Sequence, residues 1–130
     1  MEKIKSHTKV AIIGGGIMGV SLLYHLAKEG WKDLVLIEKG ELTSGSTWHA
    51  AGQCPHFVGS YNLAKVHHHS TELYKKLERE TGQSTGWHGC GSLRLAYQQE
   101  DLDWFYYVKG ILDNVGSPAE IISTQEILKI

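Results

Sequence analysis

The sequence is poor in the features that define several specialised classes of protein. It contains only two prolines and two cysteines among 130 residues, and Cys54 and Cys90 form no CxxC pair. Nothing therefore requires a disulfide, and we expect two free thiols. No apolar run approaches the ~20 residues that cross a bilayer. The formal net charge of -1 gives no electrostatic basis for binding nucleic acid or an anionic membrane.

The remaining composition is that of an ordinary globular protein, with 42% hydrophobic and 21% charged residues. A chain of this length is one domain at most. The apolar run that we expect to be the first strand follows Met1 closely, so we expect no leader peptide within these residues. The prediction is a cytoplasmic protein of bacterial type, or a protein of the mitochondrial matrix if a leader is not included.

The most informative stretch is a glycine frame near the start of the chain. The apolar run Val10–Ile13 is followed by the frame Gly14-x-Gly16-x-x-Gly19 and then by a helical pattern from Val20 to Glu29. A second apolar run, Leu34–Ile37, ends at Glu38. A strand, a glycine turn, a helix, a second strand and an acid in this order are typical of a βαβ unit that binds a dinucleotide.

Each glycine of the frame has a distinct physical role. Gly14 allows a sharp turn after the strand, because a residue without Cβ tolerates positive φ. Gly16 leaves room for a pyrophosphate against the backbone, and Gly19 allows the helix to pack closely on the sheet. A structural βα turn is the alternative, and the flanking elements argue against it.

The groups around this turn have the chemistry of a nucleotide site. The N–H groups of Gly16, Ile17 and Met18, together with the positive end of the helix dipole, are predicted to face the phosphates. Glu38 is predicted to accept hydrogen bonds from the adenosine ribose, and its charge disfavours the 2′-phosphate of NADP. This stretch alone does not decide between FAD and NAD.

The rest of the chain is predicted to be mainly helical. A long loop covers Gly40–Gly59, and loops of this length usually have a function. Helices are predicted over Tyr61–Thr81 and Glu100–Val115, and another begins at Thr124. The first of these carries an apolar face of Leu63, Val66, Leu73 and Leu77. Alternation predicts a strand over Ser92–Tyr97 and a short strand over Ala119–Ser123.

The loop carries the second candidate site. Small residues at Ser44, Gly45, Ser46, Ala50, Ala51 and Gly52 permit a large flat ligand to approach closely. The hydroxyl groups of Ser44, Ser46 and Thr47 are candidates for the second phosphate and the ribityl chain, and a helix beginning near Ser46 would add a favourable dipole. His49 is either a structural histidine or a nucleophile held against a cofactor ring.

The other histidines are not predicted to bind a metal. Residues 67–69 are three consecutive histidines, whose side chains point about 100° apart on a helix and cannot share one ion. A solvated or partly packed helical face is the expectation. His56 has only Cys54 nearby in sequence, which is a weak coincidence.

Beyond these patterns, the sequence resembles a known family. The runs Ile12–Gly16, Glu38-Lys39 and Gly45-Ser46-Thr47-Trp48-His49-Ala50-Ala51-Gly52 resemble the start of dimethylglycine dehydrogenase and sarcosine dehydrogenase, FAD-dependent oxidoreductases of the D-amino-acid oxidase class. The similarity continues through Leu73–Gly82 and Gly91–Ala96 and so covers most of the chain. It implies an α/β, Rossmann-like fold of the glutathione-reductase type, with residues 1–130 as the N-terminal part of a longer FAD-binding domain that also begins the substrate-domain elements.

The resemblance also implies a chemistry. In this family the matching histidine is joined to the flavin through its 8α position, so His49 is the candidate for covalent attachment. FAD contacts are implied at Ile17, Met18, Glu38, Lys39 and each position from Gly45 to Gln53. The family reaction removes a hydride equivalent from the N-methyl group of a small amino acid, and the resulting iminium is hydrolysed or passed to tetrahydrofolate. Substrate and folate residues lie in later regions, so no catalytic residue is assigned here and the 130 residues alone are expected to be inactive.

Two other functions stay open. One is a non-catalytic relative that retains the fold, since the class includes a regulatory subunit of a phosphatase. The other is an NAD-dependent protein, against which the Gly-Ser-Thr-Trp-His loop argues. The amine substrate and the electron acceptor are not identified by the sequence.

Overall fold

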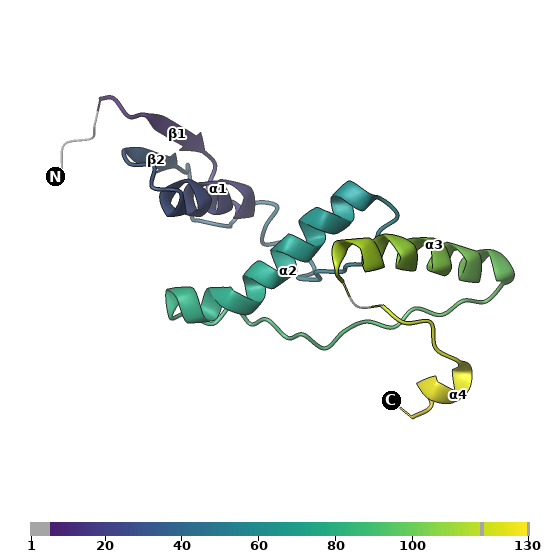
Figure 1. Cartoon of the computed structure of the whole chain (residues 1–130). Helices are drawn as coiled ribbons and strands as arrows, with labels where there is room; N and C mark the ends of the chain where they lie inside the picture. Colours follow the sequence, from purple (N-terminus) through teal and green to yellow (C-terminus); the bar gives the residue numbers. More distant parts are fainter. Residues whose placement is uncertain (1–5, 118, 130) are drawn as a thin grey trace. The chain divides into compact units, whose positions relative to one another are not determined.

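The computed structural model describes residues 6–117 and 119–129 of the chain. The chain forms two compact units, Met1–Gln53 and Cys54–Ile130. The first unit contains two strands and a helix, and the second contains helices joined by loops (Figure 1). No helix of the described residues is long and apolar enough to cross a membrane.

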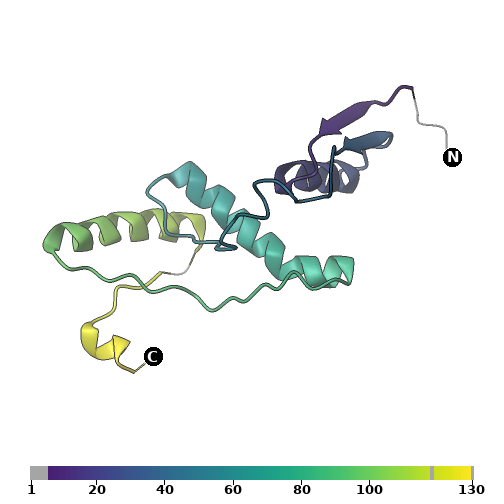
Figure 2. The same cartoon turned by 180° about the vertical axis from the view of Figure 1, so that it is seen from behind.

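The first unit is the predicted βαβ unit. Strands β1 (Val10–Ile13) and β2 (Leu34–Ile37) pair in parallel from Val10↔Leu34 to Ile13↔Ile37. Helix α1 (Ile17–Lys28) connects them and packs on both strands, as the two opposite views show (Figures 1 and 2). The helix begins at Ile17, so Gly19 lies within its first turn. The predicted α/β, Rossmann-like fold is confirmed by this parallel pair and its crossover helix.

The two faces of this small sheet differ sharply in exposure. Ile12 is 6% exposed, whereas its neighbour Ile13 is 86% exposed. Successive strand residues point to opposite faces, so α1 covers the face that carries Ile12. The apolar composition of β2 predicts burial on both faces, but Ile37 is 51% exposed. Within the described residues a helix covers only one face of the pair.

The second unit is built on two long helices. Helix α2 (Tyr61–Thr81) begins after Ser60, whose hydroxyl accepts from the Leu63 N–H, and ends at Gly82 in the left-handed conformation. Helix α3 (Gln99–Val115) begins where the Asp101 carboxylate accepts from the Tyr97 N–H. These boundaries agree with the predicted ones within one residue. The two helices pack against each other around Ala64, Val108 and Leu112.

The predicted apolar face of α2 was wrong for its first two residues, whereas Leu73 and Leu77 are half-buried. Leu63 and Val66 are 50% and 59% exposed, and the buried residues of the helix are Ala64 and Thr71. These two residues lie two turns apart on one face. The small side chain of Ala64 allows α3 to approach closely at this point. Helix α2 therefore packs on α3 through this small residue rather than through Leu63 and Val66.

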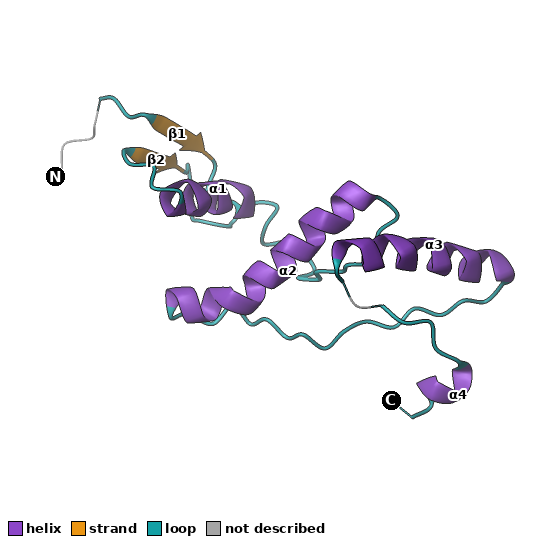
Figure 3. Cartoon of the chain, in the orientation of Figure 1, coloured by secondary structure: helices purple, strands orange, loops and turns teal. Residues whose placement is uncertain are grey.

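The two predicted strands of the second unit were also wrong. Residues 82–98 and 119–123 contain neither helix nor strand, and Figure 3 colours the long connection between α2 and α3 as loop. Alternation alone does not make a strand, because a strand needs a neighbouring backbone for its hydrogen bonds. The short helix α4 (Thr124–Ile127) begins at the predicted residue, and Ser123 caps it.

Candidate functional site

The glycine turn has the geometry that its sequence predicts. Gly14 adopts φ +104°, and its N–H extends the ladder by donating to the Ile37 carbonyl at 2.8 Å. A Cβ on Gly19 would lie 1.9 Å from the Gly14 carbonyl oxygen and 3.4 Å from the Ile12 side chain. Both glycines are therefore required for the chain to turn off β1 and enter α1 at this distance.

Gly15, to which the sequence analysis assigned no role, is buried within the turn. A Cβ there would lie 2.5 Å from Leu42 Cδ2 and 3.1 Å from the Glu38 Cβ. Its carbonyl accepts from the Thr43 N–H at 2.9 Å. The only sequence signal was the run of three glycines, and Gly15 is needed because the loop after β2 packs directly on the turn.

Glu38 is held in place by backbone donors. One carboxylate oxygen accepts from the Gly15 N–H at 2.6 Å and the other from the Gly40 N–H at 3.0 Å. These N–H groups, Gly15 first, lower the pKa of the Glu38 carboxyl below its ordinary value. The side chain is therefore a charged carboxylate at neutral pH, fixed where β2 ends.

The start of α1 is only partly capped. Its Ile17 N–H donates to Thr47 Oγ1 at 2.9 Å, across thirty residues of sequence. The N–H groups of Met18 and Gly19 have no acceptor within the described part of the chain. The first turn of α1 also lacks an acidic residue. Unpaired donors and the positive end of the helix dipole thus meet at one place, which suits an anion.

A hollow of about 470 Å³ lies at this place, inside the first unit. Most of its lining residues belong to the predicted site. They are Gly16, Ile17, Met18, Glu38, Lys39, Ser44, Gly45, Ser46, Thr47 and Ala50, together with Thr43, which the sequence analysis did not single out. The other predicted residues do not line it: Gly14, Gly19, Trp48, His49, Ala51, Gly52 and Gln53. Gly14 and Gly19 act instead through the backbone of the turn.

The loop that carries the second predicted site is a series of turns. Thr43 has φ +65°, and its carbonyl accepts from the Trp48 N–H at 3.1 Å. The His49 N–H donates to the Ser46 carbonyl at 3.2 Å. The helix considered near Ser46 does not form. The N–H groups of Trp48, His49 and Ala50 donate to carbonyls three residues earlier, and these bonds close turns. The loop contributes hydroxyl and backbone groups to the hollow rather than a second helix dipole.

The side chain of His49 is exposed and lies over its own loop. Its Nδ1 is 3.1 Å from the Gly45 carbonyl oxygen. A carbonyl oxygen only accepts, so this bond places the hydrogen on Nδ1 and leaves the lone pair of a neutral imidazole on Nε2. In this tautomer Nε2 is the nucleophilic nitrogen.

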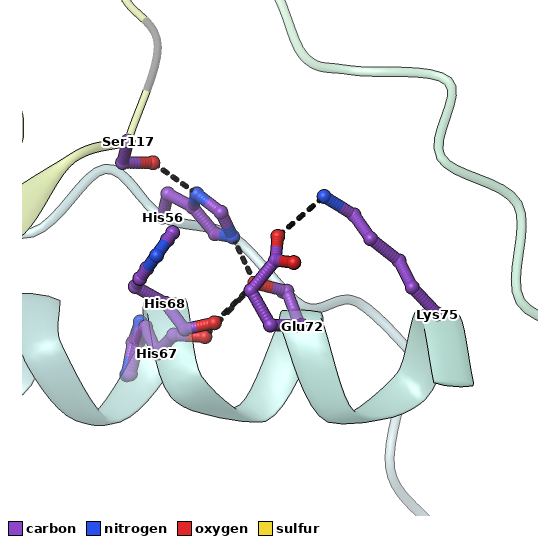
Figure 4. Close-up of polar contacts among 7 residues, drawn as sticks. His56, His67, His68, Glu72, Lys75 and Ser117 are labelled. Atoms are coloured by element: carbon purple, nitrogen blue, oxygen red, sulfur yellow. Dashed lines mark hydrogen bonds and ion pairs between the residues drawn. The ribbon is translucent and has the colours of Figure 1, made fainter. Parts of the chain in front are cut away.

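The second unit holds a different polar cluster, made by His56, Thr71 and Ser117. His56 Nδ1 is hydrogen-bonded to Ser117 Oγ and its Nε2 to Thr71 Oγ1 (Figure 4). Thr71 and Ser117 are each 2% exposed. Burial, and then the neighbouring His68 and Lys75, lower the pKa of His56. These side chains join a loop, α2 and the end of α3, and so have a structural role.

The geometry of the first unit fits a dinucleotide. Its small residues leave the turn open, Met18 with its unpaired amide lines the hollow, and a fixed carboxylate lies at the end of the second strand. These groups can bind a diphosphate and a ribose, so fold and site define a dinucleotide-binding protein of the Rossmann type.

Comparison with known proteins identifies the family. Residues 9–130 match the family described as FAD dependent oxidoreductase, DAO, and the chain belongs to that family. It is 55% identical over 103 residues to dimethylglycine dehydrogenase, mitochondrial, of Rattus norvegicus, which covers 79% of this chain and 12% of the relative. It is 41% identical over 127 residues to the mitochondrial pyruvate dehydrogenase phosphatase regulatory subunit of Mus musculus, covering 98% of this chain and 14% of that protein.

A solved structure agrees with this assignment. L-proline dehydrogenase from P. horikoshii superposes with a TM-score of 0.78 at 29% identity, covering 95% of this chain and 32% of that one. The resemblance to the dimethylglycine dehydrogenase family is thus confirmed, and the family supports FAD over NAD as the cofactor. The chain spans 12% to 14% of the length of the two curated relatives named above. The cytoplasmic location stays a prediction.

Proposed function

We propose that this chain is the FAD-binding part of an oxidoreductase that oxidises an N-methyl group of a small amino acid of the dimethylglycine or sarcosine type. The observation that supports it most is the 55% identity to dimethylglycine dehydrogenase, in a chain whose phosphate turn and histidine loop are hydrogen-bonded to each other. When bound, FAD supplies the two-electron acceptor for the hydride equivalent. The electron acceptor that follows is not identified, and tetrahydrofolate would belong to other parts of such a protein.

Different residues of the chain bind the diphosphate, the ribose and the flavin of the cofactor. The Met18 and Gly19 N–H groups and the dipole of α1 face the diphosphate, and Glu38 accepts from the ribose hydroxyl groups. Lys39, Gly45 and Ser46 line the same hollow, and Trp48 to Gln53 continue the loop. His49 supplies the Nε2 lone pair for covalent attachment at the 8α position of the flavin.

The attachment is tested by replacing His49 in the full-length protein. We expect the flavin of the parent protein to stay with the protein after acid precipitation and the flavin of His49→Ala to be released. His88→Ala, a change of an exposed histidine in the second unit, is the control and should retain the flavin. Flavin that remains attached in His49→Ala would exclude His49 as the point of attachment.

A non-catalytic regulatory protein is the second candidate. It is favoured by the 41% identity to the phosphatase regulatory subunit over nearly the whole chain. The two candidates differ in one measurable property, the bleaching of the flavin absorption by dimethylglycine or sarcosine under anaerobic conditions. Reduction by either amine supports the enzyme, whereas bound FAD that neither amine reduces supports the regulatory relative.

A further inference from the structure

One imidazole of the second unit, that of His56, holds three segments of the chain together. The ring belongs to the loop before α2, its Nε2 is hydrogen-bonded to Thr71 Oγ1 of α2, and its Nδ1 to Ser117 Oγ after the end of α3 (Figure 4). The loop is held to α2 a second time, because His67 Nδ1 donates to the Pro55 carbonyl at 2.7 Å. Among the residues that the structure describes, the Ser117 hydroxyl is bonded to His56 alone.

The hydrogen of Thr71 decides which nitrogen of His56 carries a hydrogen. Thr71 Oγ1 donates to the His67 carbonyl at 3.1 Å and to the His68 carbonyl at 2.9 Å. A hydroxyl has a single hydrogen, which is used towards these carbonyls, so Thr71 accepts in its bond to His56. The hydrogen of the neutral ring is therefore on Nε2. Its Nδ1 keeps a lone pair, to which the Ser117 hydroxyl donates.

A proton on Nδ1 would remove the acceptor of Ser117. The hydroxyl would then face an N–H group, so it would turn to accept, and its own hydrogen would have no partner among the described residues. Ser117 is 2% exposed, and a buried donor without an acceptor is costly. The bond to Thr71 differs, because Nε2 donates to it whether or not the ring is charged. Protonation therefore disturbs one side of the ring only.

The charged groups around the ring do not compensate a positive charge on it. The titratable groups that face His56 from α2 are His67, His68, Glu72 and Lys75. Glu72 is the carboxylate of this set, and it is already bonded to Lys75 Nζ at 2.5 Å. From the end of α3 the ring meets the Ser117 hydroxyl, which carries no charge (Figure 4). Burial, and then His68 and Lys75, lower the pKa of His56, in agreement with a neutral ring at neutral pH.

We propose that His56 is a pH-sensitive switch, which holds Ser117 through Nδ1 while the ring is neutral and releases it when Nδ1 takes up a proton. The loop stays attached to α2 through His67, so the part that is released is the segment from Ser117 to α4. Acidification thus loosens the end of α3 and leaves α2 in place. This inference concerns the second unit alone and does not depend on the proposed function.

The first test needs no substitution. The Ser117 N–H donates to the Leu112 carbonyl at 3.0 Å, so its exchange with deuterium reports how firmly the end of α3 is held. Mass spectrometry follows the exchange in the full-length protein from about pH 8 to about pH 5, across the ordinary histidine pKa, with rates corrected for the intrinsic effect of pH. We expect the protection of this amide to fall about fivefold, the loss of one hydrogen bond, while the amides of α2 keep theirs. Constant protection, or an equal fall in α2, would overturn the inference.

The second test separates the two hydroxyl groups that contact the ring. The pKa of His56 is measured in the full-length protein from the exchange of its ring Cε1 hydrogen, followed by mass spectrometry. Ser117→Ala removes a donor that serves only the neutral ring, so the pKa of His56 should rise by about 0.7. Thr71→Val is the matched control, because Thr71 accepts from Nε2 in both forms of the ring, and the pKa should not rise. An unchanged pKa in Ser117→Ala, or an equal rise in Thr71→Val, would place the hydrogens differently and overturn the switch.

Discussion

The two units of the chain use polar groups in opposite ways. In the first unit, the amides of Met18 and Gly19 have no acceptor among the described residues. The Thr47 hydroxyl accepts a hydrogen bond from the Ile17 N–H and donates its own hydrogen to none of these residues. In the second unit, His56 is bonded through both ring nitrogens to the buried hydroxyls of Thr71 and Ser117. The first unit leaves donors for a ligand at the start of α1, whereas both ring nitrogens of His56 are satisfied within the second unit. The neighbouring His68 Nδ1 is buried and has no hydrogen-bond partner among the described residues.

The difference shows how to recognise a binding region in a chain without a bound ligand. A buried polar group normally finds a partner within the protein, because an unmade hydrogen bond is costly. The first amides of any helix lack a partner within the helix, and where they lie beside a hollow they offer a place for an external anion. The His56 ring, by contrast, uses both of its nitrogens in bonds to Thr71 and Ser117, which indicates packing rather than recognition.

The largest effect is expected from a substitution in the glycine turn of the first unit. Gly19→Ala places a Cβ 1.9 Å from the Gly14 carbonyl oxygen, a backbone atom that cannot rotate away. We expect a loss of about 3 kcal/mol in the free energy of unfolding and loss of FAD binding, because the turn and α1 must separate. Chemical denaturation and flavin titration measure the two effects.

Gly45→Ala is the control for this change. Gly45 lines the same hollow, but a Cβ there meets nothing within 4 Å and its backbone does not require glycine. It should alter stability by less than about 0.5 kcal/mol, as surface substitutions usually do. A Gly19→Ala protein as stable as Gly45→Ala would contradict the packing that defines the site.

A smaller effect is expected at Glu38, the carboxylate that lies where β2 ends. Glu38 is charged at neutral pH, since the Gly15 and Gly40 amides lower its pKa. We expect ADP that carries a 2′-phosphate to bind about tenfold more weakly than ADP, because like charges would meet at the ribose. Glu38→Gln should narrow this difference, and binding measurements on both nucleotides test it.

The matched control is Glu41→Gln, an exposed residue of the same loop. It should leave the preference for ADP unchanged. If ADP with and without the 2′-phosphate bound equally well to the parent protein, Glu38 would not face the ribose.

The sequence predicted the first unit far better than the second. In the first unit the order of strand, turn and helix is local, and each glycine of the frame has a steric reason that is readable from spacing alone. The contribution of Gly15 was missed because it depends on Leu42 and Glu38, which return to the turn only after the second strand. Such contacts depend on tertiary packing and leave no periodic signal.

In the second unit the helix boundaries were predictable but their contacts were not. Ser60 and Gly82 mark the ends of α2 by local capping. The packed face was set by Ala64 and Thr71, a small and a polar residue, which a search for leucines passes over. The strand predicted over Ser92–Tyr97 failed for the related reason that pairing requires a neighbour, and the alternation of one segment does not supply it.

The smallest expected effect concerns His56, which is hydrogen-bonded to Thr71 and Ser117 in the second unit. The pKa of His56 is lowered by burial first and then by His68, Lys75 and His67 of α2, with Glu72 acting in the opposite direction. From the end of α3 it meets the Ser117 hydroxyl (Figure 4). The unfolded chain, with an ordinary histidine pKa of about 6.5, therefore binds more protons than the folded chain just below that pH.

The contribution of His56 to the free energy of unfolding should therefore be constant above about pH 6.5. It should fall as the pH decreases from there through the pKa of His56 in the folded chain. Because the His56 side chain is only partly buried, solvent still weakens these effects and the loss should stay below about 1 kcal/mol. Urea unfolding at several pH values measures it, and His56→Gln, which cannot titrate, should flatten the dependence. His88→Gln removes an exposed histidine of the same unit and should not. If the dependence of the free energy of unfolding on pH were unchanged in His56→Gln, the ring would not be held neutral between Thr71 and Ser117. The contrast between the internally bonded His56 and the unpaired amides of α1 would then fail.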